Sequence, residues 1–545
     1  MKNSILVIII FFAINSFSQI NGKAPVAFTS SNLPIVKINT AGVAIPNEPK
    51  IDATMQIIDN GTGMMNNVTD LPNIFDNKIG IELRGASSIN YPQQPYKLET
   101  RNALNVKQNV SLLGMPLESD WILLSNYNDK VFIRNTLAYK LFNEMGNYAT
   151  RTRFCEVVLN DEYVGVYLLM ENIKRGANRV NIAKLDATEI AGIDVTGGYI
   201  IKNDYWDATN SWLSNFHPID YPNLDVNLVY EYPKPAIIVA EQKTYIQNFI
   251  NDFETALYGN DFADLVNGYN KYIDIDSFID YLIVNELARN ADGFKKSSYF
   301  HKDIDTATGL SKLKAGPIWD FDWAYKNINE CSIYAATDGS GWAYNVNNCG
   351  GDVNSTGWIV RLLQDQNFRN KFRCRWDDLR NTTISNASLM NYIDQTTTFL
   401  NDAQGRHYQK WEHLGQDTGT PEIENDPATF AGQVQKFKDW LTLRLSWLDA
   451  NIPINTGTCG LSNVNNGAFG SRIFIFPNPS NTILNIDSNN IKISKIEIID
   501  ALGKVILSQN DTLNINVFGI ANGIYICKIY GFDNNSKNIK IIIQH

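Results

Sequence analysis

The chain has 545 residues, of which 44% are hydrophobic, and a formal net charge of −10 at pH 7. This apolar content is enough for a large packed core, so the composition excludes a globally disordered chain. The acidic balance argues against a general nucleic-acid binder, because the bulk charge does not attract a phosphate backbone.

The N-terminus has the pattern of a secretory signal peptide. Lys2 supplies a positive charge, residues 5–14 are mostly apolar, and Ser16 to Ser18 form a cleavage zone before Gln19. The apolar run is shorter than the ~20 residues that a membrane-spanning helix needs. We therefore predict a signal peptide over residues 1–19, a secreted or cell-surface location, and no transmembrane segment in the mature chain.

The next part of the chain is rich in strand patterns. Residues 20–76 form a β-rich segment that we expect to pack on the main body, which begins at residue 77. The spacing of apolar residues over 129–145 predicts a helix, and residues 154–173 predict a hairpin. Further strands are predicted at residues 79–83, 96–100 and 197–202.

The second half of the body has helical patterns, and the chain ends in short strands. Helices are predicted at residues 237–257, 275–287, 358–379, 389–400 and 430–448. Residues 453–472 form a polar linker, and residues 473–545 predict a small antiparallel β-sandwich. The predicted class is α+β, with a sheet-rich and then a helix-rich half in a body that spans 77–452.

The six cysteines match the spacing of no zinc module. Cys331 and Cys349 flank a loop rich in Gly, Asn and Tyr and are the favoured disulfide pair, which would contribute roughly 3 kcal/mol. Cys155 and Cys527 lie in strand patterns and are predicted to be buried thiols.

Two carboxylates stand two residues apart in the aromatic turn at 317–323. Asp320 and Asp322 follow a strand pattern and are flanked by tryptophans that would exclude water. Such a pair suits Mg²⁺, which prefers oxygen ligands. The alternative is a turn with two solvated acids.

A second polar group follows the helix predicted at 275–287. Asn290 and Asp292 at this helix exit could supply a metal-binding amide and a base, or could simply cap the helix and form a turn. In the sheet-rich half, Lys97 on a predicted strand and Arg134 on a predicted helix could face a cleft and meet phosphate groups. Basic groups from one half with paired acids and Mg²⁺ from the other are what phosphoryl transfer needs.

Several blocks resemble the CotH family of atypical protein kinases. The run RGASSINYPQQPYKLET at 84–100 is similar to that family's Arg-Gly-x-Ser-Ser element and its lysine-bearing strand. NELARNADGF at 285–294 and GPIWDFDWA at 316–324 match its two acidic blocks, and the likeness covers roughly residues 75 to 450. It implies a kinase-like fold of two lobes that binds ATP with Mg²⁺, or Mn²⁺, and phosphorylates protein.

The resemblance also implies roles for individual residues. Asp292 and Asp320 become the catalytic carboxylates, and Asn290, Asp320 and Asp322 the metal ligands. Arg84, Lys97 and Glu171 become candidates for nucleotide binding.

The tail resembles the type A sorting domain of the type IX secretion system. FPNPSNTILNID at 476–487, IDALGKVIL at 499–507 and NGIYICKI at 522–529 carry this likeness. It implies a Bacteroidota-type cell, the secretion machinery as a partner, and removal of the tail; the alternative is an adhesive β-sandwich.

The leading hypothesis is a secreted kinase that uses ATP and Mg²⁺ on surface or extracellular protein. The alternatives are a non-catalytic surface scaffold or adhesion protein and a carbohydrate-active protein. Glycosidase carboxylates normally face each other across a cleft, so two acids on one turn disfavour the last reading.

Overall fold

The computed structural model describes residues 26–307, 309–454, 459, 473–488, 492–500, 504–510, 512–531 and 536–545. These residues belong to two compact units, of which the smaller contains residues 144–146, 363–378 and those from 452 onward. The predicted signal peptide and most of the predicted linker lie outside the described residues.

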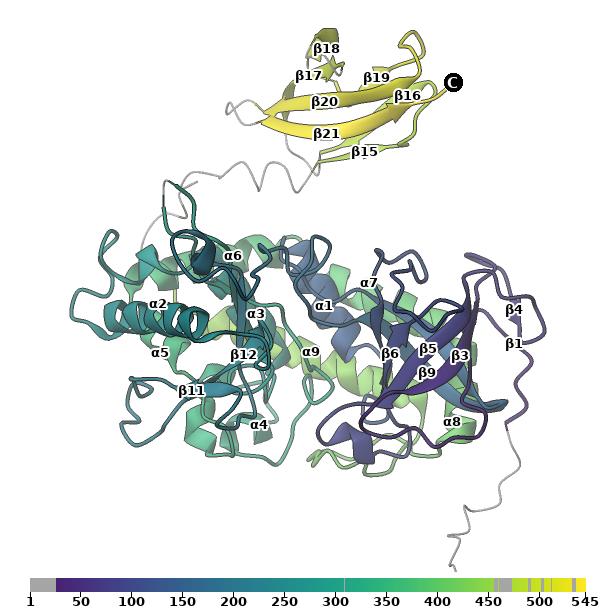
Figure 1. Ribbon diagram of the computed structural model, residues 1–545, viewed down its shortest axis with the longest axis horizontal. Helices are drawn as coiled ribbons and strands as arrows, with labels where there is room; N and C mark the ends of the chain where they lie inside the picture. The colour runs from purple at the N-terminus through teal and green to yellow at the C-terminus, as the bar shows by residue number, and fades with distance from the viewer. Residues whose placement is uncertain are drawn as a thin grey trace, which may run out of the picture. The chain divides into compact units, whose positions relative to one another are not determined.

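A closed barrel of strands occupies the N-terminal part of the larger unit (Figure 1). Its strands are, in spatial order, β2 (Ile35–Asn39), β3 (Ile51–Ile58), β5 (Phe75–Leu83), β6 (Tyr96–Thr100), β7 (Asp120–Ser125), β9 (Glu162–Glu171) and β8 (Thr152–Leu159). Neighbours are antiparallel except β2 and β8, whose parallel pairing closes the barrel. The sequence boundary placed at residue 76 falls within β5. Outside the barrel, β1 (Ser30–Ser31) pairs with β4 (Asn66–Asn67).

The barrel interior follows from the alternation of side chains along each strand. On β6, Tyr96 and Leu98 are buried in the barrel core, whereas Lys97 and Glu99 are only partly buried. Trp121 and Leu123 on β7 join the same core. This alternation sends charged side chains of β6 to the outer face of the barrel.

A five-stranded antiparallel sheet follows in the larger unit. Its spatial order is β11 (Ser211–Leu213), β12 (Asn227–Tyr232), β10 (Tyr199–Asn203), β13 (Ser298–Lys302) and β14 (Lys314–Ala315). The helix α3 (Ile275–Ala288) leads into this sheet. The Asp274 side chain accepts the Ser277 N–H at its N-terminus, and Arg289 ends it in the left-handed region, with φ of 43°.

The other helices are α1 (Arg134–Glu144), α2 (Ala240–Tyr258), α4 (Ser332–Ala335), α5 (Trp358–Leu362), α6 (Gln366–Arg380), α7 (Asn386–Phe399), α8 (Asn401–Lys410) and α9 (Phe430–Asn451). The helix α8 packs against β9 of the barrel (Figure 1). Among the described residues, every helix is too short or too polar to span a bilayer.

The C-terminal strands form two sheets with a common core. One sheet contains β15 (Phe474–Phe476), β16 (Ile483–Asp487) and β19 (Asn514–Asn516). The other contains β18 (Val505–Asn510), β17 (Ile493–Ile499), β20 (Gly523–Gly531) and β21 (Ser536–Ile543). Leu484 and Ile515 from the first sheet and Ile498 and Ile529 from the second are fully buried in one apolar cluster.

The predicted order of a sheet-rich half, a helical half and C-terminal strands is confirmed. The helix expected over 129–145 begins only at Arg134, because Phe132 has φ of 64°. The helix expected over 358–379 is divided into α5 and α6.

The predicted disulfide between Cys331 and Cys349 is confirmed. Cys374 and Cys459 form a second bond that the sequence did not indicate. Cys155 and Cys527 are buried thiols, as predicted.

Candidate functional site

The hairpin of β13 and β14 brings the two acidic blocks together. The loop with Asp292 ends where β13 starts, and the turn with Asp320 begins where β14 ends. Because these strands are antiparallel partners, the two ends are neighbours. The Ser297 hydroxyl, just before β13, donates to Asp320 Oδ2 at 2.7 Å.

The backbone of the acidic turn is fixed by two buried asparagines. Asp320 has φ of 55°, a left-handed conformation that aspartate tolerates better than most residues. Its carbonyl accepts a hydrogen bond from Asn290 Nδ2 at 3.2 Å, and the Phe321 N–H donates to Asn135 Oδ1 at 2.9 Å. Such a conformation persists only where surrounding contacts hold it, as they do here.

Asp322 is held from the barrel side of the molecule. Asn128, in the segment after β7, donates from Nδ2 to Asp322 Oδ2 at 2.8 Å. The same amide lies 3.3 Å from the Tyr91 hydroxyl. Tyr91 comes from the loop between β5 and β6, so two barrel loops meet the acidic turn.

Asn290 and Asp292 share one tight loop. Asn290 is fully buried, and its Oδ1 accepts the Asp292 N–H at 3.2 Å. The Asn290 side-chain amide therefore binds the backbone of both Asp292 and Asp320. Its role as a metal ligand stays a prediction.

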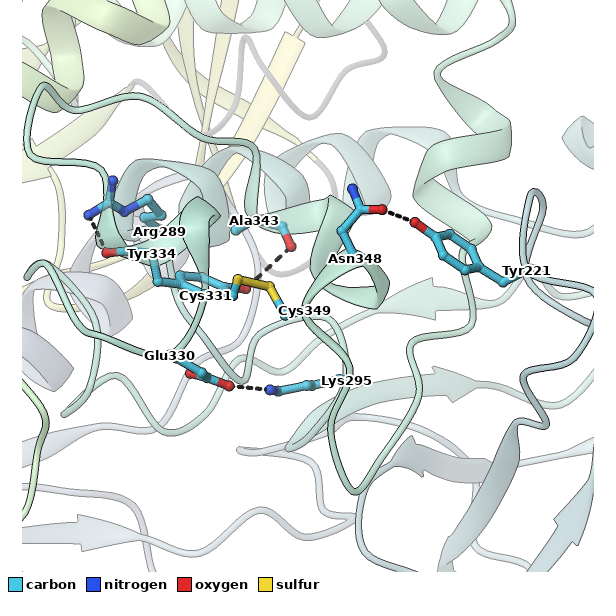
Figure 2. Close-up of a disulfide and its surroundings, with 9 residues drawn as sticks. All are labelled: Tyr221, Arg289, Lys295, Glu330, Cys331, Tyr334, Ala343, Asn348 and Cys349. Atoms are coloured by element: carbon cyan, nitrogen blue, oxygen red, sulfur yellow. Dashed lines mark hydrogen bonds and ion pairs between the residues drawn. A yellow bond between two sulfur atoms is a disulfide. The ribbon is translucent and has the colours of Figure 1, made fainter.

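Two lysines follow Asp292 in its loop, and each has an acidic partner just outside the segment that the Cys331–Cys349 disulfide closes. Lys295 Nζ lies 2.6 Å from Glu330, which directly precedes Cys331 (Figure 2). Lys296 Nζ lies 2.9 Å from Asp352. Arg289, at the end of α3, donates to the Tyr334 carbonyl at 3.0 Å, within the same segment. The disulfide therefore closes a segment that Arg289 contacts and whose two flanks are bonded to the Asp292 loop.

Burial and neighbouring carboxylates raise the pKa values of Asp320 and Asp292. Burial, followed by the charge of Asp322, raises the pKa of Asp320 to about 7, although Arg84 opposes this shift. Burial raises the pKa of Asp292 to about 6, against the charges of Lys296 and Lys295. Two carboxyl groups with pKa values near neutrality in one cluster are typical of functional sites.

The predicted basic residues differ in their relation to the acidic turn. The Arg84 guanidinium lies 5.6 Å from the Trp319 ring and acts electrostatically on Asp320. The Lys97 Nζ lies 3.1 Å from Glu82 on the neighbouring strand, where Lys50 also binds at 3.2 Å. The structure thus brings Arg84 to the acids and places Lys97 in an ion cluster on the barrel wall.

Glu171 ends β9 as a buried carboxylate with several partners. Arg151 lies 2.9 Å from Oε1, and Oε2 accepts from the Tyr148 hydroxyl at 3.0 Å. Arg179 is 3.8 Å from the same carboxylate. These bonds already satisfy Glu171, so any contact of this residue with a nucleotide stays a prediction.

The donor set of the acidic turn fits a small hard cation. Asp320 and Asp322 each accept a hydrogen bond at Oδ2, and no donor within the described residues reaches either Oδ1. No cluster of three or more His, Cys, Asp or Glu side chains suited to a metal occurs in the described part of the chain. Mg²⁺ usually takes one or two carboxylates and completes its shell with water and phosphate oxygens. Two available carboxylate oxygens therefore match Mg²⁺ better than a metal that needs an all-protein cage.

Three of the residues that build this site were missed in the sequence: Asn128, Asn135 and Ser297. Asn128 lies in a polar run after a buried strand, which was the available signal. Asn135 and Ser297 carry no local pattern that separates them from other polar residues.

The comparisons with known proteins match two separate stretches of the chain. The model of the CotH kinase protein family matches residues 81–448, and that of the secretion-system C-terminal sorting domain matches residues 474–544. A search of curated proteins finds no match. The sorting domain supports export through the type IX machinery to the cell surface or beyond. Both resemblances inferred from the sequence are confirmed, and the chain belongs to the CotH kinase protein family.

Proposed function

We propose that this protein is an exported kinase, which transfers the γ-phosphoryl group of ATP to a hydroxyl of surface or extracellular protein. The observation that supports this most is the convergence of Asp292, Asp320 and Asp322 with Arg84 at one place. Carboxylates for a cation and a guanidinium for phosphate are the parts that phosphoryl transfer requires. In this proposal the barrel and the helical part correspond to the two lobes of a kinase.

The two aspartates of the turn would hold Mg²⁺ through their Oδ1 atoms. When bound, Mg²⁺ supplies neutralisation of the phosphate oxygens and fixes their position. Arg84 would bind the phosphates beside it, with Lys97 and Glu171 as further nucleotide contacts if they leave their present partners.

Asp292 would orient the hydroxyl of the acceptor protein. The hydroxyl oxygen forms a bond to the γ-phosphorus, the bond from that phosphorus to the β–γ bridging oxygen breaks, and ADP leaves. Asp292 accepts the hydroxyl proton, for which a pKa of about 6 is well placed.

Labelling with γ-³²P ATP tests this proposal. The purified chain with Mg²⁺ should label itself or casein, and Asp320→Asn should reduce labelling by about 100-fold or more. Asp264→Asn, at an exposed aspartate of the same unit, is the control and should label normally. Absence of labelling in the wild-type chain would favour the scaffold alternative.

A further inference from the structure

A side-chain amide from a barrel loop binds a carboxylate of the acidic turn. Asn128 is 3% exposed, and its Nδ2 donates to Asp322 Oδ2 at 2.8 Å across 194 positions of sequence. Asp322 has no other hydrogen-bond donor within the described residues. The orientation of this carboxylate therefore depends on a residue from a different part of the fold.

The backbone of Asn128 is also held in place, by a residue close to Asp322 in sequence. The Asn128 backbone carbonyl accepts a hydrogen bond from Lys326 Nζ at 3.2 Å. Lys326 is buried and lies 3.1 Å from Glu422, so its position is fixed in turn. Lys326 thus fixes the backbone of Asn128, while the side-chain amide binds Asp322 and lies 3.3 Å from the Tyr91 hydroxyl.

An amide is the donor type that suits this position. One N–H fixes Oδ2 and leaves the lone pairs of Oδ1 for a cation. A lysine or arginine in this place would also fix the carboxylate, but its charge would repel the cation. Partners that orient a ligating carboxylate in this way commonly affect metal affinity by about 10–100-fold.

We infer that Asn128 is a positioning residue, which sets the affinity of the acidic turn for a divalent cation through Asp322. This inference rests on the proposed function for the cation's role, but its test needs no phosphoryl transfer. It assigns control of the cation site to a loop of the barrel, so that the two parts of the unit must be correctly docked before the cation binds tightly.

Binding of Mn²⁺ alone, measured by electron paramagnetic resonance on the full chain, tests this inference. Asn128→Ala should weaken Mn²⁺ binding by about 10–100-fold. Asn128→Leu fills nearly the same space without a hydrogen-bond donor and should weaken Mn²⁺ binding equally. This variant replaces Asn128→Ala in the test if the alanine variant folds poorly. Asn126→Ala, at another buried asparagine two positions earlier, is the matched control and should bind Mn²⁺ as the wild type does.

A double-mutant cycle with Asp322→Asn separates positioning from a merely structural role. In the Asp322→Asn background, Asn128→Ala should change the Mn²⁺ affinity less than twofold. An equal loss in both backgrounds, or wild-type affinity in both Asn128 variants, would overturn the inference, as would absence of Mn²⁺ binding in the wild-type chain. Mn²⁺ binding with the expected cycle but no ATP labelling would support the inference and overturn the proposed kinase activity.

Discussion

Replacing Asp320 by asparagine should make the metal-free protein more stable at pH 8 but not at pH 4. The pKa of Asp320 is raised from 3.8 to about 7, so the folded protein holds a proton that the unfolded chain has already released between these values. Its stability therefore falls as the pH rises through this window, and the cost is complete above pH 7. Asparagine carries no charge and avoids this cost, while its Oδ1 can still accept from Ser297.

The size of the effect follows from the shift. A change of the pKa from 3.8 to about 7 corresponds to at most about 4 kcal/mol, at 1.36 kcal/mol per pKa unit. This value already includes the favourable charge of Arg84. Relaxation around the ionised carboxylate lowers this value, so we expect a gain of about 1–3 kcal/mol at pH 8.

Urea denaturation at pH 4 and pH 8, without divalent ions, measures the effect. The gain for Asp320→Asn should be present at pH 8 and absent at pH 4, and Asp264→Asn at an exposed turn should show no gain at either. Addition of Mn²⁺ at pH 8 should stabilise the wild type and not the variant. An equal change in the free energy of unfolding at both pH values would refute the reasoning, because it would show that ionisation of Asp320 does not destabilise the folded protein.

The remaining predictions concern the surroundings of the site. The double variant Cys331→Ser, Cys349→Ser should lower the free energy of unfolding by about 2–4 kcal/mol in urea denaturation. A loss below about 0.5 kcal/mol would show that the disulfide does not stabilise the segment. Glu171→Gln should cost about 1–3 kcal/mol by the same assay, because it weakens the bonds from Arg151 and Tyr148 while water can still reach Arg151, and the Mn²⁺ affinity should stay unchanged. Arg84→Met should raise the KM for ATP about tenfold in steady-state kinetics, and an unchanged KM would remove Arg84 from the phosphate site.

Local patterns were enough to find the centre of the candidate site. Asp320 and Asp322 stand out because two acids follow a strand and lie among aromatic residues, and Asp292 stands out at the exit of a buried helix. The hairpin that joins these blocks could be expected from the strand patterns around them. Helix ends were harder to predict. The start of α1 depends on the left-handed conformation of Phe132, which the spacing of apolar residues does not reveal.

Contacts between distant segments could not be predicted from the sequence. Asn128 reaches Asp322 only because the fold brings the segment after β7 next to the turn that follows β14. The ion pair of Lys97 with Glu82 was also not predicted, because it depends on which strand pairs with the strand that carries Lys97. The bond between Cys374 and Cys459 was equally hidden, because 85 positions of sequence separate the two residues.

Crystals of the protein soaked with Mn²⁺ and a non-hydrolysable ATP analogue give the most direct test of the central claim. The account predicts an anomalous peak at metal–ligand distances, about 2.1 Å, from an oxygen of Asp320 and of Asp322, with the phosphates beside Arg84. A peak elsewhere, or a nucleotide bound away from the acidic turn, would contradict it.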